Sequence, residues 1–188
     1  GKIYAPDLSL QASPNAMATA LASIKVADDA SRLEWLRAAK SAYDASYHVK
    51  AQPGDLDMGE VLAHLRDVIP ENAIVTNGAG NFAIWPNKFL KFGPKGRLLA
   101  PQSGAMGYGV PAAIAAKLHD PSRFVLCFAG DGDFQMNGNE LGSAMQAGLP
   151  LIILIVNNGT YGTIRMHQER NYPERVSGTE LVNPDFVT

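Results

Sequence analysis

The chain has 188 residues, of which 46% are hydrophobic and 18% are charged, and its formal net charge is −2. This balance is typical of a globular protein, and the scattered basic residues exclude the basic face that nucleic acids or anionic membranes attract. Because no apolar run is long enough to span a membrane and no signal-peptide pattern opens the chain, we expect a cytoplasmic protein.

Two alanine-rich segments near the start, 13–26 and 29–49, have helical patterns. Ser13 is the expected N-cap of the first helix, because a proline follows it at the first helical position. Trp35 recurs with other large side chains at helical spacing, which predicts a packed face. The segment KAQPGD at 50–55 then breaks the pattern. We therefore predict an α-helical N-terminal appendage followed by a separate domain.

The residues after this break alternate between helical patterns and short apolar runs. The expected helices are 58–69, 81–90, 107–118 and 139–148, and the expected strands are 73–77, 97–100, 123–130 and 149–158. The last run is almost uninterrupted, as in a central parallel strand with helices on both faces. The single cysteine, Cys127, lies in an expected strand and is predicted to be a core residue. The fold class predicted is α/β, a doubly wound and mainly parallel sheet.

An acidic turn, GDGDFQMNGNE, begins at the end of the expected strand 123–130. It is compatible with a plain strand-to-helix connection, because Gly adopts positive φ and Asp closes Asx turns. A second turn, NNGTYG at 157–162, places Asn158 27 positions after Asp131. Both turns follow parallel strands, whose carboxyl ends bind ligands. A carboxylate, an amide oxygen and a backbone carbonyl suit Mg²⁺ beside phosphate oxygens, so the spacing favours a Mg²⁺–diphosphate site.

The motif GDG, followed after about two dozen residues by NN at the end of an apolar strand, resembles the fingerprint of thiamine diphosphate (ThDP)-dependent enzymes. The segment SGAMGYGVPAAIAAK at 103–117 independently resembles the pyrimidine-binding segment of acetolactate synthase-like enzymes. The resemblance implies that 51–188 is the C-terminal diphosphate-binding (PP) domain of that family, truncated at its C-terminus. It also implies that 1–50 is the tail of the family's middle domain plus linker helices.

The resemblance assigns the metal and the diphosphate to particular residues. Asp131 and the side chain of Asn158 would coordinate Mg²⁺, with the carbonyl of Thr160 as the third protein ligand. Backbone N–H groups of Gly132 and Asp133 would bind the diphosphate, as would those of Gly162 and Thr163 at the start of the next helix.

The resemblance also assigns residues to the remainder of the cofactor. The segment NGAGNFAIW matches the family's first cofactor loop, which makes Ala79, Asn81 and Phe82 candidates beside the diphosphate. The carbonyl of Gly104 would accept a hydrogen bond from the aminopyrimidine, and Met106 would hold the cofactor in its bent form. In another context Met106 would be interpreted as a core methionine.

The activity implied is that of a 2-oxo acid decarboxylase or carboligase, a transferase or lyase that acts on substrates such as pyruvate through the ThDP ylid and enamine. The family's catalytic glutamate lies on a pyrimidine-binding domain, usually of a partner subunit, and no segment before residue 50 is long enough to supply it. We therefore expect no catalytic residue in this chain, an inactive fragment on its own, and a homo-oligomer.

Two departures from biosynthetic acetolactate synthases concern the substrate side. Asn81, Phe82 and Ala83 stand where those enzymes have Gln-His-Gln, and His167 stands where they have a substrate-shaping tryptophan. His167 is therefore either a substrate contact or an exposed helix residue.

Two alternative functions stay open at this level. A non-catalytic relative would keep the ThDP fold as a structural or regulatory module. A dinucleotide-binding domain would use TNGAGNF at 76–82 as a Rossmann-like turn, although the G-x-G-x-x-G spacing is incomplete.

Overall fold

The computed structural model describes residues 3–25 and 29–187, and it divides into two compact units, Gly1–Ser46 and Tyr47–Thr188. The first unit contains helices α1 (Pro14–Ala22) and α2 (Ala30–Ala45). Ser13 caps α1, since its Oγ accepts the N–H of Ala16 at 3.2 Å. Neither helix has a buried residue, and Trp35 is 71% exposed. The packed face predicted around Trp35 is wrong within this unit, because two short helices offer little surface to bury one another.

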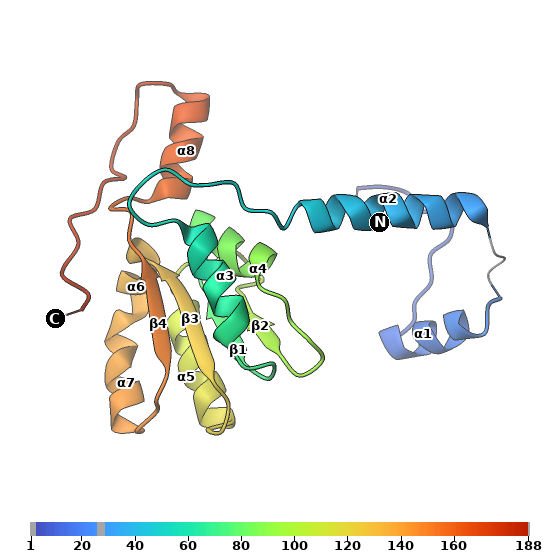
Figure 1. The fold of residues 1–188 in the computed structure, drawn as a ribbon, viewed down its shortest axis with the longest axis horizontal. Helices are drawn as coiled ribbons and strands as arrows, with labels where there is room; N and C mark the ends of the chain where they lie inside the picture. The colour runs from blue at the N-terminus through green and yellow to red at the C-terminus, as the bar shows by residue number, and fades with distance from the viewer. Residues whose placement is uncertain (1–2, 26–28, 188) are drawn as a thin grey trace. The chain divides into compact units, whose positions relative to one another are not determined.

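The second unit is built on a four-stranded parallel sheet of order β2-β1-β3-β4 (Figure 1). Its strands are β1 (Ile74–Asn77), β2 (Arg97–Leu99), β3 (Val125–Gly130) and β4 (Ile152–Val156). All six residues of β3 are buried, as expected for a strand between two neighbours and two helical layers. Each strand lies inside the run predicted for it, which confirms the parallel α/β fold class.

The helices of this unit precede, connect and follow the strands. They are α3 (Met58–Val68), α4 (Ile84–Phe89), α5 (Gly109–His119), α6 (Asp131–Asn137), α7 (Leu141–Gln146) and α8 (Gly162–Asn171), with short 3₁₀ turns η1 (Asn81–Ala83) and η2 (Gly138–Glu140). The acidic turn expected after β3 is instead the start of α6, because a carboxylate in the first turn of a helix is stabilised by the helix dipole.

The core has one cluster on each face of the sheet, because successive strand residues point to opposite faces. Val75 and Phe128 pack on one face with Leu62 of α3. Ile74 and Cys127 pack on the other face with side chains of α5, among others. Helices therefore cover both faces, as a doubly wound sheet requires.

Cys127 is fully buried in β3, as predicted. Burial raises the pKa of its thiol to about 11, so the thiolate is scarce at neutral pH and the residue is a core side chain. Within residues 3–25 and 29–187, no helix is both long enough and apolar enough to cross a membrane.

Candidate functional site

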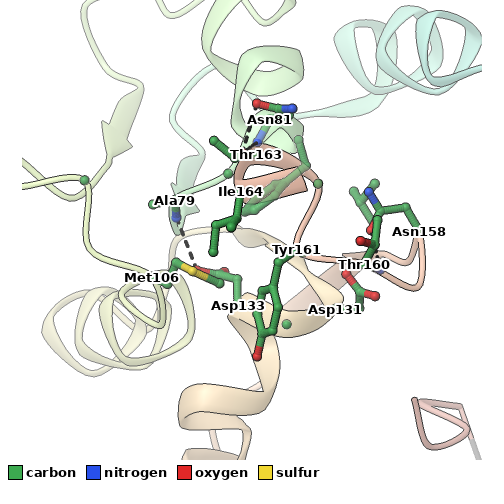
Figure 2. Close-up of a pocket in the computed structure, with 17 residues that line it drawn as sticks. Ala79, Asn81, Met106, Asp131, Asp133, Asn158, Thr160, Tyr161, Thr163 and Ile164 are labelled. Atoms are coloured by element: carbon green, nitrogen blue, oxygen red, sulfur yellow. Dashed lines mark hydrogen bonds between the residues drawn. The ribbon is translucent and has the colours of Figure 1, made fainter. Parts of the chain in front are cut away.

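A pocket of about 200 Å³ lies beyond the carboxyl ends of β1, β3 and β4 (Figure 2). It brings together all twelve residues predicted to bind the cofactor: Ala79, Asn81, Phe82, Gly104, Met106, Asp131, Gly132, Asp133, Asn158, Thr160, Gly162 and Thr163. The five other lining residues are Gly80, Gly130, Val156, Tyr161 and Ile164. These segments are distant in the chain, and the parallel strands return each of them to one edge of the sheet.

Asp131 is the first residue after β3 and is only 2% exposed. Its Oδ2 accepts the N–H of Gly159 at 2.9 Å and the side-chain amide of Asn183 at 2.7 Å. Both donors are neutral, and no ion pair between described residues includes Asp131. A buried carboxylate without a cationic partner is costly, which makes this position suitable for a bound cation.

The turn after β4 places two further oxygen atoms at the same pocket. Asn158 Oδ1 accepts the N–H of Thr160 at 3.2 Å, and the Thr160 carbonyl accepts the N–H of Gly162 at 2.9 Å. Gly159 has φ +66°, a conformation that glycine adopts without strain. Figure 2 shows Asn158 and Thr160 beside Asp131. Each of these oxygens has further acceptor capacity, so a carboxylate, an amide and a carbonyl form a set of hard ligands.

The loop after β1 is joined to the start of α8 by one hydroxyl group. Thr163 Oγ1 accepts the backbone N–H of Asn81 at 3.0 Å and donates to Asn81 Oδ1 at 3.0 Å (Figure 2). No side chain caps the N-terminus of α8, and although the N–H of Gly162 donates to the Thr160 carbonyl, the N–H groups of Thr163 and Ile164 are available to an anion. The two segments thus form one wall of the pocket although they are 82 positions apart.

The side chain of Asp133 ties two loops together, a role that the sequence analysis missed. Its Oδ1 accepts the N–H of Gly107 at 2.7 Å and the N–H of Ala79 at 3.2 Å. The residue is 3% exposed, and this burial raises the pKa of its carboxyl group against the lowering effect of the two hydrogen bonds. A Cβ at Gly78 would clash with the buried carboxylate of Asp133, so this position requires glycine.

Two glycines missed by the sequence analysis make room for one aromatic ring. A Cβ at either Gly80 or Gly130 would approach the ring of Phe82 to 2.9 Å. Gly80 follows the recognised loop residue Ala79, and Gly130 precedes the recognised Asp131. The same GAG and GDG motifs could therefore have identified both.

A family model described as "Thiamine pyrophosphate enzyme, C-terminal TPP binding domain" matches residues 78–188. The chain belongs to this family. The matched region contains β2, β3, β4 and every residue that lines the pocket. This match gives no support to the dinucleotide-binding alternative, since the family consists of thiamine pyrophosphate-binding domains.

Relatives among curated proteins include large subunits of acetolactate synthase. The protein of Parasynechococcus marenigrum is 42% identical over 130 residues, which are 68% of this chain and 21% of the relative. The protein of Corynebacterium glutamicum is 37% identical over 163 residues, which are 83% of this chain and 26% of the relative. The chain therefore spans about a fifth to a quarter of the length of these relatives.

His167 does not line the pocket of this thiamine pyrophosphate-binding domain. It is an exposed residue of α8. Among the described residues, no group of three or more His, Cys, Asp or Glu side chains is arranged to hold a metal. The predicted metal ligands include only one such side chain, Asp131, and depend otherwise on an amide and a carbonyl oxygen.

Proposed function

We propose that this domain binds ThDP through Mg²⁺ as part of a 2-oxo acid decarboxylase or carboligase similar to acetolactate synthase. The observation that carries the proposal is the pocket itself. Residues chosen from short motifs in separate parts of the sequence line one cavity, and the buried Asp131 stands there without a cationic partner. Pyruvate or another 2-oxo acid is the substrate proposed for the whole enzyme, because the relatives are acetolactate synthases.

Three oxygens would hold the cation: those of the Asp131 carboxylate, the Asn158 amide and the Thr160 carbonyl. Mg²⁺ there would compensate the charge of a diphosphate that Asp131 alone would repel. The uncapped first turn of α8, including Thr163, would receive phosphate oxygens through N–H groups. The N–H groups of Gly132 and Asp133, at the start of α6, are proposed to bind the diphosphate in the same way.

The chain's contribution to the reaction is to bind and orient. ThDP supplies the electron sink that allows bonds next to a 2-oxo group to break or form. Met106 and Gly104 lie on the same pocket and would fix the position of the aminopyrimidine ring. Asp133 holds the loops of Ala79 and Gly107 together, so it would keep that side of the pocket in one arrangement.

The remainder of the active site is proposed to come from a pyrimidine-binding domain of the full-length enzyme, usually on a partner subunit. The chain alone should therefore release no CO₂ from pyruvate when ThDP and Mg²⁺ are present. A homo-oligomer is proposed because apolar side chains such as Met145, 82% exposed, and Ile152, 52% exposed on edge strand β4, are available to a neighbouring copy. Light scattering over a dilution series tests assembly, and a constant monomer mass would contradict it.

Calorimetric titration with ThDP tests the binding proposal. We expect binding in Mg²⁺ and none in EDTA, with NAD as a ligand that does not bind. Asp131→Ala should weaken ThDP binding by about tenfold or more, since it removes the anionic metal ligand. Asp55→Ala changes an exposed aspartate and should bind as the wild type does. Equal ThDP affinity with EDTA present would contradict the metal-dependent mode.

A further inference from the structure

Asn183 lies where the turns after β3 and β4 meet, although it belongs to the segment that follows α8. Its Nδ2 donates to Asp131 Oδ2 at 2.7 Å and to Asn157 Oδ1 at 2.8 Å. Its Oδ1 accepts a hydrogen bond from Gln135 Nε2 of α6 at 2.8 Å. The half-buried side chain of Asn183 thus connects the turns after two strands to helix α6, through three hydrogen bonds of its amide group.

The Asp131 carboxylate is held through only one of its two oxygens. Both hydrogen bonds described for that carboxylate, from Asn183 and from the N–H of Gly159, end on Oδ2. Oδ1 takes part in none of the hydrogen bonds between described residues. Two neutral donors therefore fix the orientation of the carboxylate through one oxygen and leave the other oxygen for a ligand.

The segment that carries Asn183 also holds the turn that supplies the other two proposed ligands. Leu181 donates its N–H to the carbonyl of Gly159 at 2.9 Å. Thr160 Oγ1 donates to the carbonyl of Thr179 at 2.7 Å, and the N–H of Tyr161 donates to the same carbonyl at 2.8 Å. Residues 179–183 therefore contact both turns of the site.

Resting on the proposed function, we propose that Asn183 is a positioning residue for the divalent cation. Its amide holds the Asp131 carboxylate in the orientation that ligates the cation, and it attaches segment 179–183 to the same site. Because cation binding and docking of the segment share one carboxylate, each stabilises the other by the same coupling free energy.

The test measures Mn²⁺ affinity in the presence of ThDP, by electron paramagnetic resonance, and hydrogen exchange of the same protein. Asn183→Leu keeps the approximate size of the side chain and removes its donors. We expect a loss of Mn²⁺ affinity of about tenfold or more, as for other residues that orient metal ligands. The amides of Gly159 and Leu181 should also exchange faster, and Mn²⁺ should slow their exchange in the wild type.

Two further variants make this test specific. Asn183→Gln retains an amide donor and should recover part of the affinity, which a merely space-filling role does not predict. Asn139→Leu makes the same substitution at an exposed asparagine and should leave Mn²⁺ binding unchanged. Asn183→Ser, whose hydroxyl is too short to reach both acceptors, provides a smaller substitution with the same expected loss as Asn183→Leu.

The outcomes separate this proposal from the proposed function. Wild-type affinity in either Asn183→Leu or Asn183→Ser would overturn the positioning role and leave cation binding intact. A loss of affinity accompanied by faster exchange throughout β3 would show general unfolding, and it would also overturn the role. A wild-type chain that binds neither Mn²⁺ nor ThDP would overturn the proposed function itself.

Discussion

The two units of the chain use the same local rules for helices but differ completely in burial. Asp29 caps α2 and Asp57 caps α3 in the same way, each through a carboxylate that accepts the N–H two residues ahead. Yet α2 has no buried residue, whereas Leu62 of α3 is fully buried against the sheet. Helix formation is therefore local in both units, while a core and a pocket arise only where strands distant in sequence pair.

This comparison predicts its largest difference for aromatic residues. Phe128 in β3 is fully buried, and Phe128→Ala should lower the free energy of unfolding by about 3–5 kcal/mol because it leaves a cavity. Trp35→Ala in α2 removes an even larger aromatic side chain from an exposed position and should change the free energy of unfolding by no more than about 0.5 kcal/mol. Urea unfolding followed by circular dichroism measures both changes in the free energy of unfolding. Equal changes for the two variants would contradict the difference in burial between the units.

Two glycines of the second unit differ in the space around their Cβ positions, and they predict smaller effects of opposite sign. A Cβ at Gly109 would approach the backbone N of Gly78 to 2.8 Å, so Gly109→Ala should destabilise the unit by about 1–3 kcal/mol through overpacking. Gly142 in α7 has open space at its Cβ position, and Gly142→Ala should stabilise the helix by about 0.5–1 kcal/mol. Thermal unfolding of both variants decides, and a stabilised Gly109→Ala would contradict the close packing of α5 on β1.

The smallest expected effect concerns the two helix caps. Hydrogen bonds from the N–H groups of Gln52 and Gly59 lower the pKa of Asp57, and bonds from Ser31 lower that of Asp29. Since the folded pKa is lowered, each cap stabilises at neutral pH, and this stabilisation is lost as the pH falls from about 3.8, the unfolded value, through the folded pKa.

Acid titration of Asp57→Asn and Asp29→Asn tests this sign and its location. Asp57→Asn should flatten the pH dependence of cooperative unfolding, because α3 is part of the core. Asp29→Asn should change only the helical signal of the first unit, because α2 contributes no buried residue. An identical effect of the two substitutions on cooperative unfolding would show that the first unit is coupled to the second.

The sequence was sufficient to locate the strands and twelve of the seventeen residues that line the pocket, because both depend on short patterns. Apolar runs located all four strands, and the GDG and NN motifs located the turns at their carboxyl ends. The same patterns did not indicate that α6 begins directly at Asp131, since glycine and aspartate are equally typical of turns.

The interactions that the sequence did not indicate are those that side chains make with residues distant in the sequence. Asn183 meets Asp131 across 52 positions, and Asp133 meets Ala79 across 54 positions. No periodicity or spacing rule connects such pairs, because their contact depends on the strand order. The exposure of Trp35 was missed for a related reason: helical spacing defines a face but does not supply a surface to cover it.

The strand order also determines when the unit can fold as the chain is made. Ile74 of β1 pairs with Val125 of β3, so the first strand lacks its inner neighbour until 51 more residues have been synthesised. β3 in turn needs β4, and Asn183 reaches Asp131 only after α8. Contacts of such long sequence separation make folding slow and expose apolar strands to aggregation in the meantime. During synthesis, β1 therefore waits longer for its second neighbour than the other strands of this sheet do, and the contact between Asn183 and Asp131 forms only after α8 has been made.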